Sequence, residues 1–130
     1  MPVPVISLYA GLLGLLALVL AADCGRIRGR LGVSVGDGGH PELTCAMRRH
    51  ANFIEWVPLS LILLLLLELS GVARSAIHGL GAALVLARIL HAIGLKTETM
   101  KSLPRALGAG GTALILLISA LWLIILCVRR

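Results

Sequence analysis

Four long apolar segments constrain the fold of this chain more than any other feature of its sequence. They cover residues 2–22, 51–70, 75–94 and 107–128, and each is close to the roughly 20 residues that a helix needs to cross a bilayer. Only helices and closed β-barrels satisfy their backbone hydrogen bonds in lipid, and the alternating polarity of barrel strands is absent here. The segments therefore predict an all-α fold, a bundle of four transmembrane helices.

The overall composition supports a membrane protein and argues against a water-soluble one. Hydrophobic residues make up 58% of the 130 positions and charged residues 14%. A soluble domain has about 45–50% apolar and about 25% charged residues. Because a chain this short cannot bury so large an apolar excess in its own interior, we expect its surface to face lipid. Residues 1–130 are predicted to form one domain.

The first segment is predicted to be retained rather than removed as a signal peptide. It lacks the basic residues that begin a signal peptide, and its apolar stretch is longer than the usual, about 7–15 residues. The sequence LAADC at 20–24 is similar to a lipoprotein signal, but Asp23 occupies the position before Cys24 where a small residue is required.

The basic residues are distributed unequally between the two ends of such a bundle. Eight of them lie in the segments 23–51 and 95–106, on one side of the membrane: Arg26, Arg28, Arg30, Arg48, Arg49, Lys96, Lys101 and Arg105. Three lie on the other side: Arg74, Arg129 and Arg130. By the positive-inside rule, both large connecting segments are expected in the cytoplasm and both termini outside it. The net charge of +6 does not indicate a nucleic-acid partner, because only 3% of the residues are aromatic and no binding motif occurs.

Neither a metal site nor a disulfide framework is expected. The three cysteines, Cys24, Cys45 and Cys127, form no CxxC pair and have no histidine at metal-ligand spacing. No nucleotide-binding loop or nucleophile motif occurs either. The charged residues inside the apolar segments are therefore the remaining candidates for chemistry.

Polar residues inside the second and third segments are the strongest functional signal. The sequence GDGG at 36–39 predicts a turn, and Pro41 predicts the start of a helix that continues through the second segment. On this helix the spacing i, i+4, i+7 aligns three polar residues in one stripe, namely Arg48, Asn52 and Glu55. In the third segment, Arg88 and His91 are one turn apart.

The depth of these charges limits what they can do. At a rise of 1.5 Å per residue, Glu55 lies about 9 Å below the cytoplasmic end of its span, and Arg88 lies about 12 Å below the end of the next. An unpaired charge at that depth costs about 2.5–3.5 kcal/mol or more, so we expect both to face protein or water, and to face each other. A structural Glu55–Arg88 pair and a polar ligand site both explain them. The ligand site also accounts for Arg48, Asn52 and His91.

These residues resemble a known family. The sequences RRHANFIEWVPLSLILLLLLELSG (48–71), ARILHAIGL (87–95) and VGDGGHPEL (35–43) are similar to those of the membrane-associated proteins in eicosanoid and glutathione metabolism, the MAPEG family, and to its small bacterial members above all. The pattern R-x-x-x-N-x-x-E followed by R-x-x-H is the most specific part. The likeness extends over nearly the whole chain in length, number of spans and topology.

The resemblance implies a homotrimer with glutathione bound between neighbouring subunits near the cytoplasmic face. By position, Arg48, Asn52 and Glu55 match the second-helix residues that hold glutathione in the family. Arg88 matches a third-helix arginine on the same ligand, and His91 lies one turn further along. Glutathione carries two carboxylates and one ammonium group, so the arginines would bind its carboxylates and Glu55 its ammonium.

The chain departs from the family pattern in two places that concern catalysis. Leu95 stands where the eicosanoid-forming members have a tyrosine, and Arg105 matches the arginine that activates the glutathione thiol only after a small shift in register. The resemblance implies a glutathione S-transferase or glutathione-dependent peroxidase, with glutathione as co-substrate, acting on lipophilic electrophiles in a bacterial inner membrane. The alternatives are a non-catalytic membrane scaffold, or a small exporter, in which the Glu/Arg pair is structural. Small four-helix exporters place an acid in their first span, whereas residues 2–22 contain none.

Overall fold

The computed structural model describes residues 2–98 and 102–129 and contains four helices within them. In chain order these are α1 (Pro4–Leu31), α2 (Pro41–Leu69), α3 (Arg74–Gly94) and α4 (Leu103–Val128). Each is long and apolar enough to cross a membrane, as judged by length and composition. No strand occurs in the described part of the chain. The prediction of an all-α bundle of four spanning helices is confirmed.

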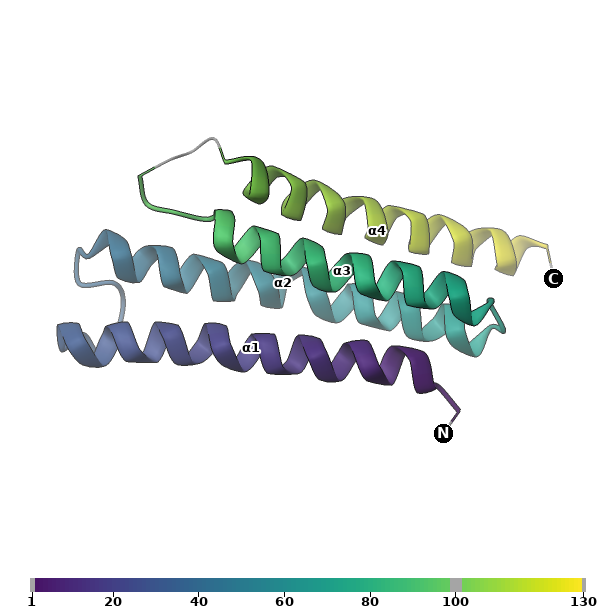
Figure 1. Ribbon diagram of the computed structural model, residues 1–130, viewed down its shortest axis with the longest axis horizontal. Coiled ribbons are helices and arrows are strands. Elements are labelled where there is room, and N and C mark those ends of the chain that lie inside the picture. Colours follow the sequence, from purple (N-terminus) through teal and green to yellow (C-terminus); the bar gives the residue numbers. More distant parts are fainter. Residues whose placement is uncertain (1, 99–101, 130) are drawn as a thin grey trace.

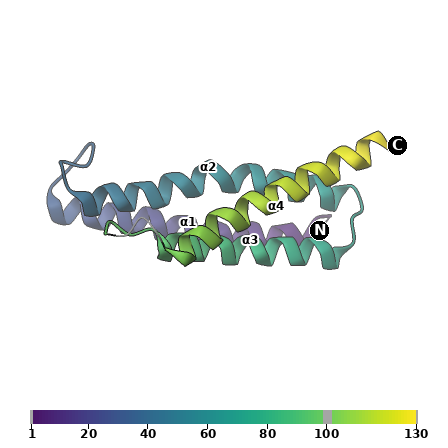
Figure 2. The ribbon, with the colours of Figure 1, turned by 90° about the horizontal axis from the view of Figure 1, so that it is seen from above.

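The helices run alternately up and down, with α3 in a central position (Figure 1). One side of the bundle is formed by α1, which packs on α2 and α3, and the other by α4, which packs on α3 and α2. Among the described residues, no Cα atom of α1 lies within 8 Å of a Cα atom of α4. Seen from above, α4 crosses the others obliquely, starting beside α3 and ending beside α2 (Figure 2).

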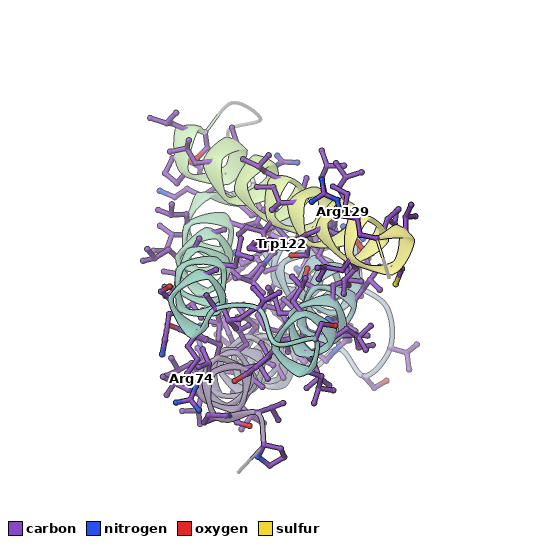
Figure 3. The ribbon with its side chains drawn as sticks, turned by 90° about the vertical axis from the view of Figure 1, so that its right-hand side faces the viewer. Arg74, Trp122 and Arg129 are labelled. Atoms are coloured by element: carbon purple, nitrogen blue, oxygen red, sulfur yellow. The ribbon has the colours of Figure 1, made fainter. Side chains whose placement is uncertain are left out.

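The two ends of the bundle differ in character. The loop between α1 and α2, the end of α3 and the start of α4 lie at one end, which we call the loop end (Figure 1). The short turn between α2 and α3 and both ends of the described chain lie at the opposite end, where Arg74 and Arg129 are labelled in Figure 3. The two large connecting segments therefore share one side, as the sequence predicted.

The first helix is longer than the sequence predicted. A span ending at 22 followed by a connecting segment at 23–51 was expected, but α1 continues to Leu31 and the loop is confined to 32–40. The extension is amphipathic: its Ile27 is buried against Leu43 and Ala46 of α2. The helix then ends at Gly32, whose positive φ of 67° closes the last turn.

The predicted turn at 36–39 is confirmed. Gly36, Gly38 and Gly39 all have positive φ, which glycine adopts without steric cost. Asp37 holds the turn together, because its Oδ1 accepts the Gly39 N–H at 2.9 Å and its Oδ2 accepts the Thr44 hydroxyl at 2.7 Å. These two hydrogen bonds lower the pKa of the Asp37 carboxyl below its usual value. The turn leads directly into α2, which begins at Pro41.

Glycines set how closely two of the helix pairs approach. A Cβ atom at Gly81 of α3 would lie 2.3 Å from the ring of Tyr9, so α1 meets α3 through a glycine and an aromatic side chain. The Tyr9 hydroxyl also lies 3.0 Å from Nδ1 of His78. A Cβ at Gly108 of α4 would lie 2.4 Å from the backbone nitrogen of His91. These close contacts fix the rotation of α3 about its own axis, and with it the direction in which Arg88 points.

Most of the apolar surface remains outside the bundle. Buried residues make up 17–33% of the most apolar window of each helix. Large aliphatic side chains such as Leu15, Leu18, Leu69 and Leu86 are more than half exposed. In water this surface would drive aggregation, whereas in a bilayer it matches the solvent. The exposed apolar side chains agree with the prediction, made from composition, that the surface faces lipid.

Candidate functional site

The three polar residues predicted to form one stripe on α2 point in two different directions. At 3.6 residues per turn, Arg48 and Glu55 point within about 20° of each other, while Asn52 is rotated from them by about 40–60°. Arg48 Nη1 lies 3.4 Å from Glu55 Oε1, and the two side chains are 58% and 51% exposed. Asn52 is half-buried and faces α3. An ion pair therefore lies on the outer surface of a spanning helix, with an amide beside it.

Arg88 is enclosed by the bundle and contacts Asn52 rather than Glu55. Its side chain is 2% exposed. Its Nη2 donates a 2.7 Å hydrogen bond to Asn52 Oδ1, and its Nη1 donates a 3.4 Å hydrogen bond to Thr112 Oγ1 of α4. The guanidinium carbon also lies 5.9 Å from the centre of the Phe53 ring. The guanidinium is thus surrounded by neutral groups.

The expectation that Glu55 and Arg88 pair with each other is wrong within one chain. Glu55 pairs with Arg48 on the outer surface, and Arg88 pairs with Asn52 and Thr112 inside. The depth estimate placed both charges at a similar level, but depth does not fix the direction of a side chain around its helix. That direction is decided by which face of α2 packs on α3.

His91 lies one turn after Arg88 and is covered by α4. It is 4% exposed, and its Nδ1 has no hydrogen-bond partner among the described residues. Arg88, Arg105 and Arg48 are all near enough to act on it electrostatically. These three arginines belong to three different helices, and positive charges near a buried, neutral cluster favour a negatively charged ligand.

Arg105 lies in the first turn of α4, where that helix meets the end of α3. A Cβ at Gly94 would lie 2.2 Å from the Arg105 backbone nitrogen, so the two backbones are in direct contact. The Arg105 side chain is half-buried. It thus lies at the loop end of the bundle.

Sequence reasoning missed Thr112, which links α4 to this cluster. It is fully buried, donates a 2.7 Å hydrogen bond to the Gly108 carbonyl and accepts one from Arg88. A lone threonine in an apolar helix is unremarkable by itself. The sequence does contain a signal that could have found it, namely spacing. Arg105, Gly108 and Thr112 are at positions i, i+3 and i+7, which places them on one face of a helix.

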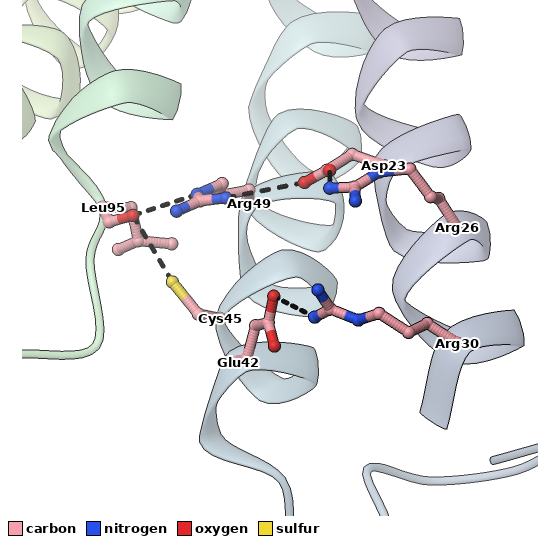
Figure 4. A network of polar contacts seen from close by, with 7 residues as sticks. All are labelled: Asp23, Arg26, Arg30, Glu42, Cys45, Arg49 and Leu95. Carbon is pink, nitrogen blue, oxygen red and sulfur yellow. Dashed lines mark hydrogen bonds and ion pairs between the residues drawn. The ribbon is translucent and has the colours of Figure 1, made fainter. Parts of the chain in front are cut away.

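A second polar network, drawn in Figure 4, holds the loop end together. The carbonyl of Leu95, just after α3, accepts hydrogen bonds from Arg49 Nε at 2.9 Å and from the Cys45 thiol at 3.4 Å. Arg49 also lies 3.6 Å from Asp23 of α1. A further ion pair joins Arg30 and Glu42. Leu95 is thus tied to α2 through its backbone carbonyl.

Two clefts meet at Arg48. One, of about 440 Å³, lies between the start of α2 and the segment after α3, and it is lined by Asp37, Gly39, Pro41, Thr44, Cys45, Arg48, Leu95, Lys96 and Thr97. The other, of about 450 Å³, is lined by Gly36, Asp37, Thr44, Met47, Arg48 and Ala51. The exposed guanidinium of Arg48 is therefore accessible from the loop end as well as from the side of the bundle.

The comparisons with known proteins agree with this architecture. The sequence profile of the MAPEG family matches residues 6–126. The chain is 34% identical over 117 residues to a protein named inner membrane protein YecN from Escherichia coli K12, and to the protein of that name from Escherichia coli O6:H1, with 89% of each chain covered. No solved structure matches it significantly. A four-helix chain that matches the family over nearly its full length is a multi-pass integral membrane protein and belongs to the MAPEG family.

Proposed function

We propose that this protein binds glutathione on the α2 surface formed by Arg48, Asn52 and Glu55. The observation that carries the proposal is the Arg48–Glu55 pair, whose side chains are 58% and 51% exposed on a membrane-spanning helix. Charges left facing hydrocarbon would cost about 2.5–3.5 kcal/mol each. A polar ligand and a protein cover remove that cost, and membership of a family named for glutathione metabolism favours this ligand.

The chemistry of the donor set fits glutathione. Its two carboxylates suit the guanidinium of Arg48 and the positive region around Arg88 and His91. Its ammonium group suits the carboxylate of Glu55. Asn52, between them, adds a neutral amide for the peptide groups of the ligand. Arg48 and Glu55 also pair with one another, across 3.4 Å.

A second copy of this chain is the proposed cover for the site. The resemblance to the family implies a homotrimer, with the ligand between subunits. The exposed charged pair supports this assembly, because a neighbouring subunit would shield it from lipid. Gly11, Gly14 and Gly79 lie on open surface, where a Cβ would meet nothing within 4 Å, so they leave room for close helix contacts.

The proposed reactions are glutathione transfer and glutathione-dependent peroxide reduction on lipophilic electrophiles. In transfer, the thiol loses its proton, the sulfur forms a bond to an electrophilic carbon, and the displaced electron pair leaves with the leaving group or takes up a proton. In peroxide reduction, two glutathione molecules become a disulfide while a hydroperoxide becomes an alcohol and water. Arg105 is the proposed cation that stabilises the thiolate.

The membrane location also belongs to the proposal. The relative in Escherichia coli is named an inner membrane protein, and we assign this chain to the same kind of membrane. The basic loop end is assigned to the cytoplasm and both termini to the other side. The ligand would then enter from the cytoplasm, where the two clefts at Arg48 open, and the electrophile from the bilayer.

Calorimetric titration of the detergent-solubilised protein with glutathione tests the proposal. We expect Glu55→Gln to weaken binding by about tenfold or more, because a charge-assisted hydrogen bond contributes roughly 1.5–3 kcal/mol. Glu42→Gln is a matched control: Glu42 is on the same helix, similarly exposed at 54% and paired with an arginine, but near the helix start. An absence of glutathione binding by the unmodified protein, or equal effects of the two variants, would refute the assignment.

One observation favours binding without catalysis as a second candidate. Leu95 has no hydroxyl to offer the thiol, and its carbonyl is already engaged by Arg49 and Cys45. A membrane scaffold or regulatory protein that binds glutathione but does not activate it would keep Arg48, Asn52 and Glu55 and have no use for Arg105. The two candidates differ in whether the bound thiol ionises.

A further inference from the structure

Arg88 carries a positive charge into the bundle and joins one residue of α2 to one residue of α4. It donates to Asn52 of α2 at 2.7 Å and to Thr112 of α4 at 3.4 Å. At 2% exposure its guanidinium has almost no free surface. A molecule bound over the outer face of α2 would therefore contact Asn52, with Arg88 behind it.

The direction of each hydrogen bond in this set is determined by chemistry. A guanidinium group has only donors, so the carboxamide of Asn52 must turn its oxygen toward Arg88. Its NH₂ group then lies on the opposite branch of the planar carboxamide. Thr112 donates its own proton to the Gly108 carbonyl at 2.7 Å, which leaves its oxygen free to accept from Arg88. Thr112 of α4 thus holds Arg88 in place, and Arg88 in turn holds the orientation of the Asn52 carboxamide.

We propose that Arg88 and Thr112 are positioning residues that make Asn52 a dedicated hydrogen-bond donor at the ligand surface. With its oxygen held inward, Asn52 can offer only N–H groups, so it selects an acceptor on the ligand, a carboxylate or an amide carbonyl. The charge of Arg88 polarises this amide and strengthens it as a donor. The ligand contact rests on the proposed function, whereas the orientation of Asn52 does not.

The sequence provides a direct probe of that orientation. Asn52 is the one asparagine in the chain, and glutamine is absent. A ¹⁵N-labelled sample in detergent micelles therefore gives a single pair of side-chain NH₂ signals, and that pair belongs to Asn52. No ligand is needed for this measurement.

The first arm of the experiment compares two buried hydroxyls on the same face of α4. Thr112→Val keeps the shape of the side chain but removes the acceptor for Arg88. Ser119→Ala removes a hydroxyl that is equally buried, two turns further along, and that has no hydrogen-bond partner among the described residues. We expect the Asn52 NH₂ signals to move in Thr112→Val and to stay in place in Ser119→Ala. Unmoved signals in Thr112→Val would overturn the proposal.

The second arm measures glutathione binding by calorimetry. Thr112→Val should weaken binding about three- to tenfold, the range expected for the loss of one supporting hydrogen bond, and Thr112→Ser should restore it. In an Asn52→Ala background, Thr112→Val should have no further effect, because there is no amide left to orient. A merely structural role for Thr112 predicts additive losses instead, and additivity would also overturn the proposal.

The two arms separate this inference from the proposed function. If the unmodified protein does not bind glutathione, the proposed function fails, while the NH₂ signals still decide whether Thr112 and Arg88 orient Asn52. If glutathione binds but the Asn52 NH₂ signals do not move in Thr112→Val, the proposed function stands and the positioning role is refuted. Arg88 itself is left unchanged in both arms, because its removal would take away the hydrogen-bond partner of Asn52 Oδ1 and the packing of a fully enclosed side chain at the same time.

Discussion

The carboxylate of Glu68 closes the N-terminus of α1: its Oε2 accepts a 2.8 Å hydrogen bond from the backbone N–H of Ile6. Its Oε1 accepts a second, of 3.0 Å, from the N–H of Val5. The first N–H groups of a helix have no partner within the helix, and here the end of α2 supplies one. The negative charge also meets the positive end of the α1 dipole. A residue at the edge of an apolar span thereby joins two helices at the end opposite the candidate site.

Replacing this cap should destabilise the protein. We expect Glu68→Ala to lower the free energy of unfolding by about 1–2 kcal/mol, as loss of a helix cap does elsewhere. Glu68→Gln keeps one acceptor oxygen and should lose less. Thermal unfolding in detergent, followed by circular dichroism, measures both. An unchanged midpoint in Glu68→Ala would show that the cap contributes nothing.

Two glycines of α4 should respond in opposite ways to replacement by alanine. A Cβ at Gly108 would lie 2.4 Å and 2.5 Å from backbone atoms of His91 and Ala87, so Gly108→Ala must push α3 and α4 apart. At Gly110 a Cβ meets nothing within 4 Å, and Gly110→Ala should be neutral or stabilise the helix by about 0.5–1 kcal/mol. Thermal unfolding of both variants tests the contact. Equal midpoints would contradict the close α3–α4 packing.

Thiol ionisation tests the role of Arg105. A nearby cation favours the thiolate, so thiolate absorbance near 240 nm should appear at neutral pH when glutathione is added to the protein. Arg105→Ala should remove this signal and leave glutathione affinity nearly unchanged. Arg30→Ala, which alters an exposed arginine at the same end of the bundle, serves as the control. Glutathione that binds without a thiolate signal below about pH 8 would favour the non-catalytic candidate.

The topology can be tested independently of any ligand. Both termini lie at the end opposite the basic loop end (Figure 1), and the positive-inside rule assigns them to the non-cytoplasmic side. Alkaline phosphatase fused to the C-terminus should therefore be active, and a green fluorescent protein fused there should stay dark. A fluorescent fusion with an inactive phosphatase would reverse the orientation and place the clefts at Arg48 outside the cytoplasm.

The turn before α2 should be sensitive to acid. The pKa of the Asp37 carboxyl is lowered in the folded protein by hydrogen bonds from Gly39 and Thr44. Its ionised form therefore stabilises the turn above the unfolded pKa, about 3.9, and that contribution is lost as the pH falls through the lower folded value. The amide signal of Gly39 in an NMR titration should show a midpoint below about 3.9. Asp37→Asn should abolish the transition, and a midpoint above 4 would contradict the hydrogen-bonded turn.

The sequence by itself determined the fold class, the number of spans and the pairing of the two basic segments on one side. Hydrocarbon permits few backbone arrangements, so long apolar runs are decisive. Local chemistry was equally informative at the GDGG turn and at Pro41, where α2 begins as predicted. The start of α4 at Leu103 and the extension of α1 to Leu31 were not predicted, because charged and small residues continue a helix beyond the bilayer without any change in pattern.

Only the tertiary structure decided how the polar residues are paired. Helical periodicity aligned Arg48, Asn52 and Glu55, but it did not reveal which side of that stripe faces α3. Close contacts at Gly81 and Gly108 set the rotation of α3, and they direct Arg88 to Asn52 and Thr112 while Glu55 remains outside with Arg48. The physical reason is that a sequence pattern fixes the relative directions of side chains on one helix, whereas the partner of each side chain depends on how several helices pack together.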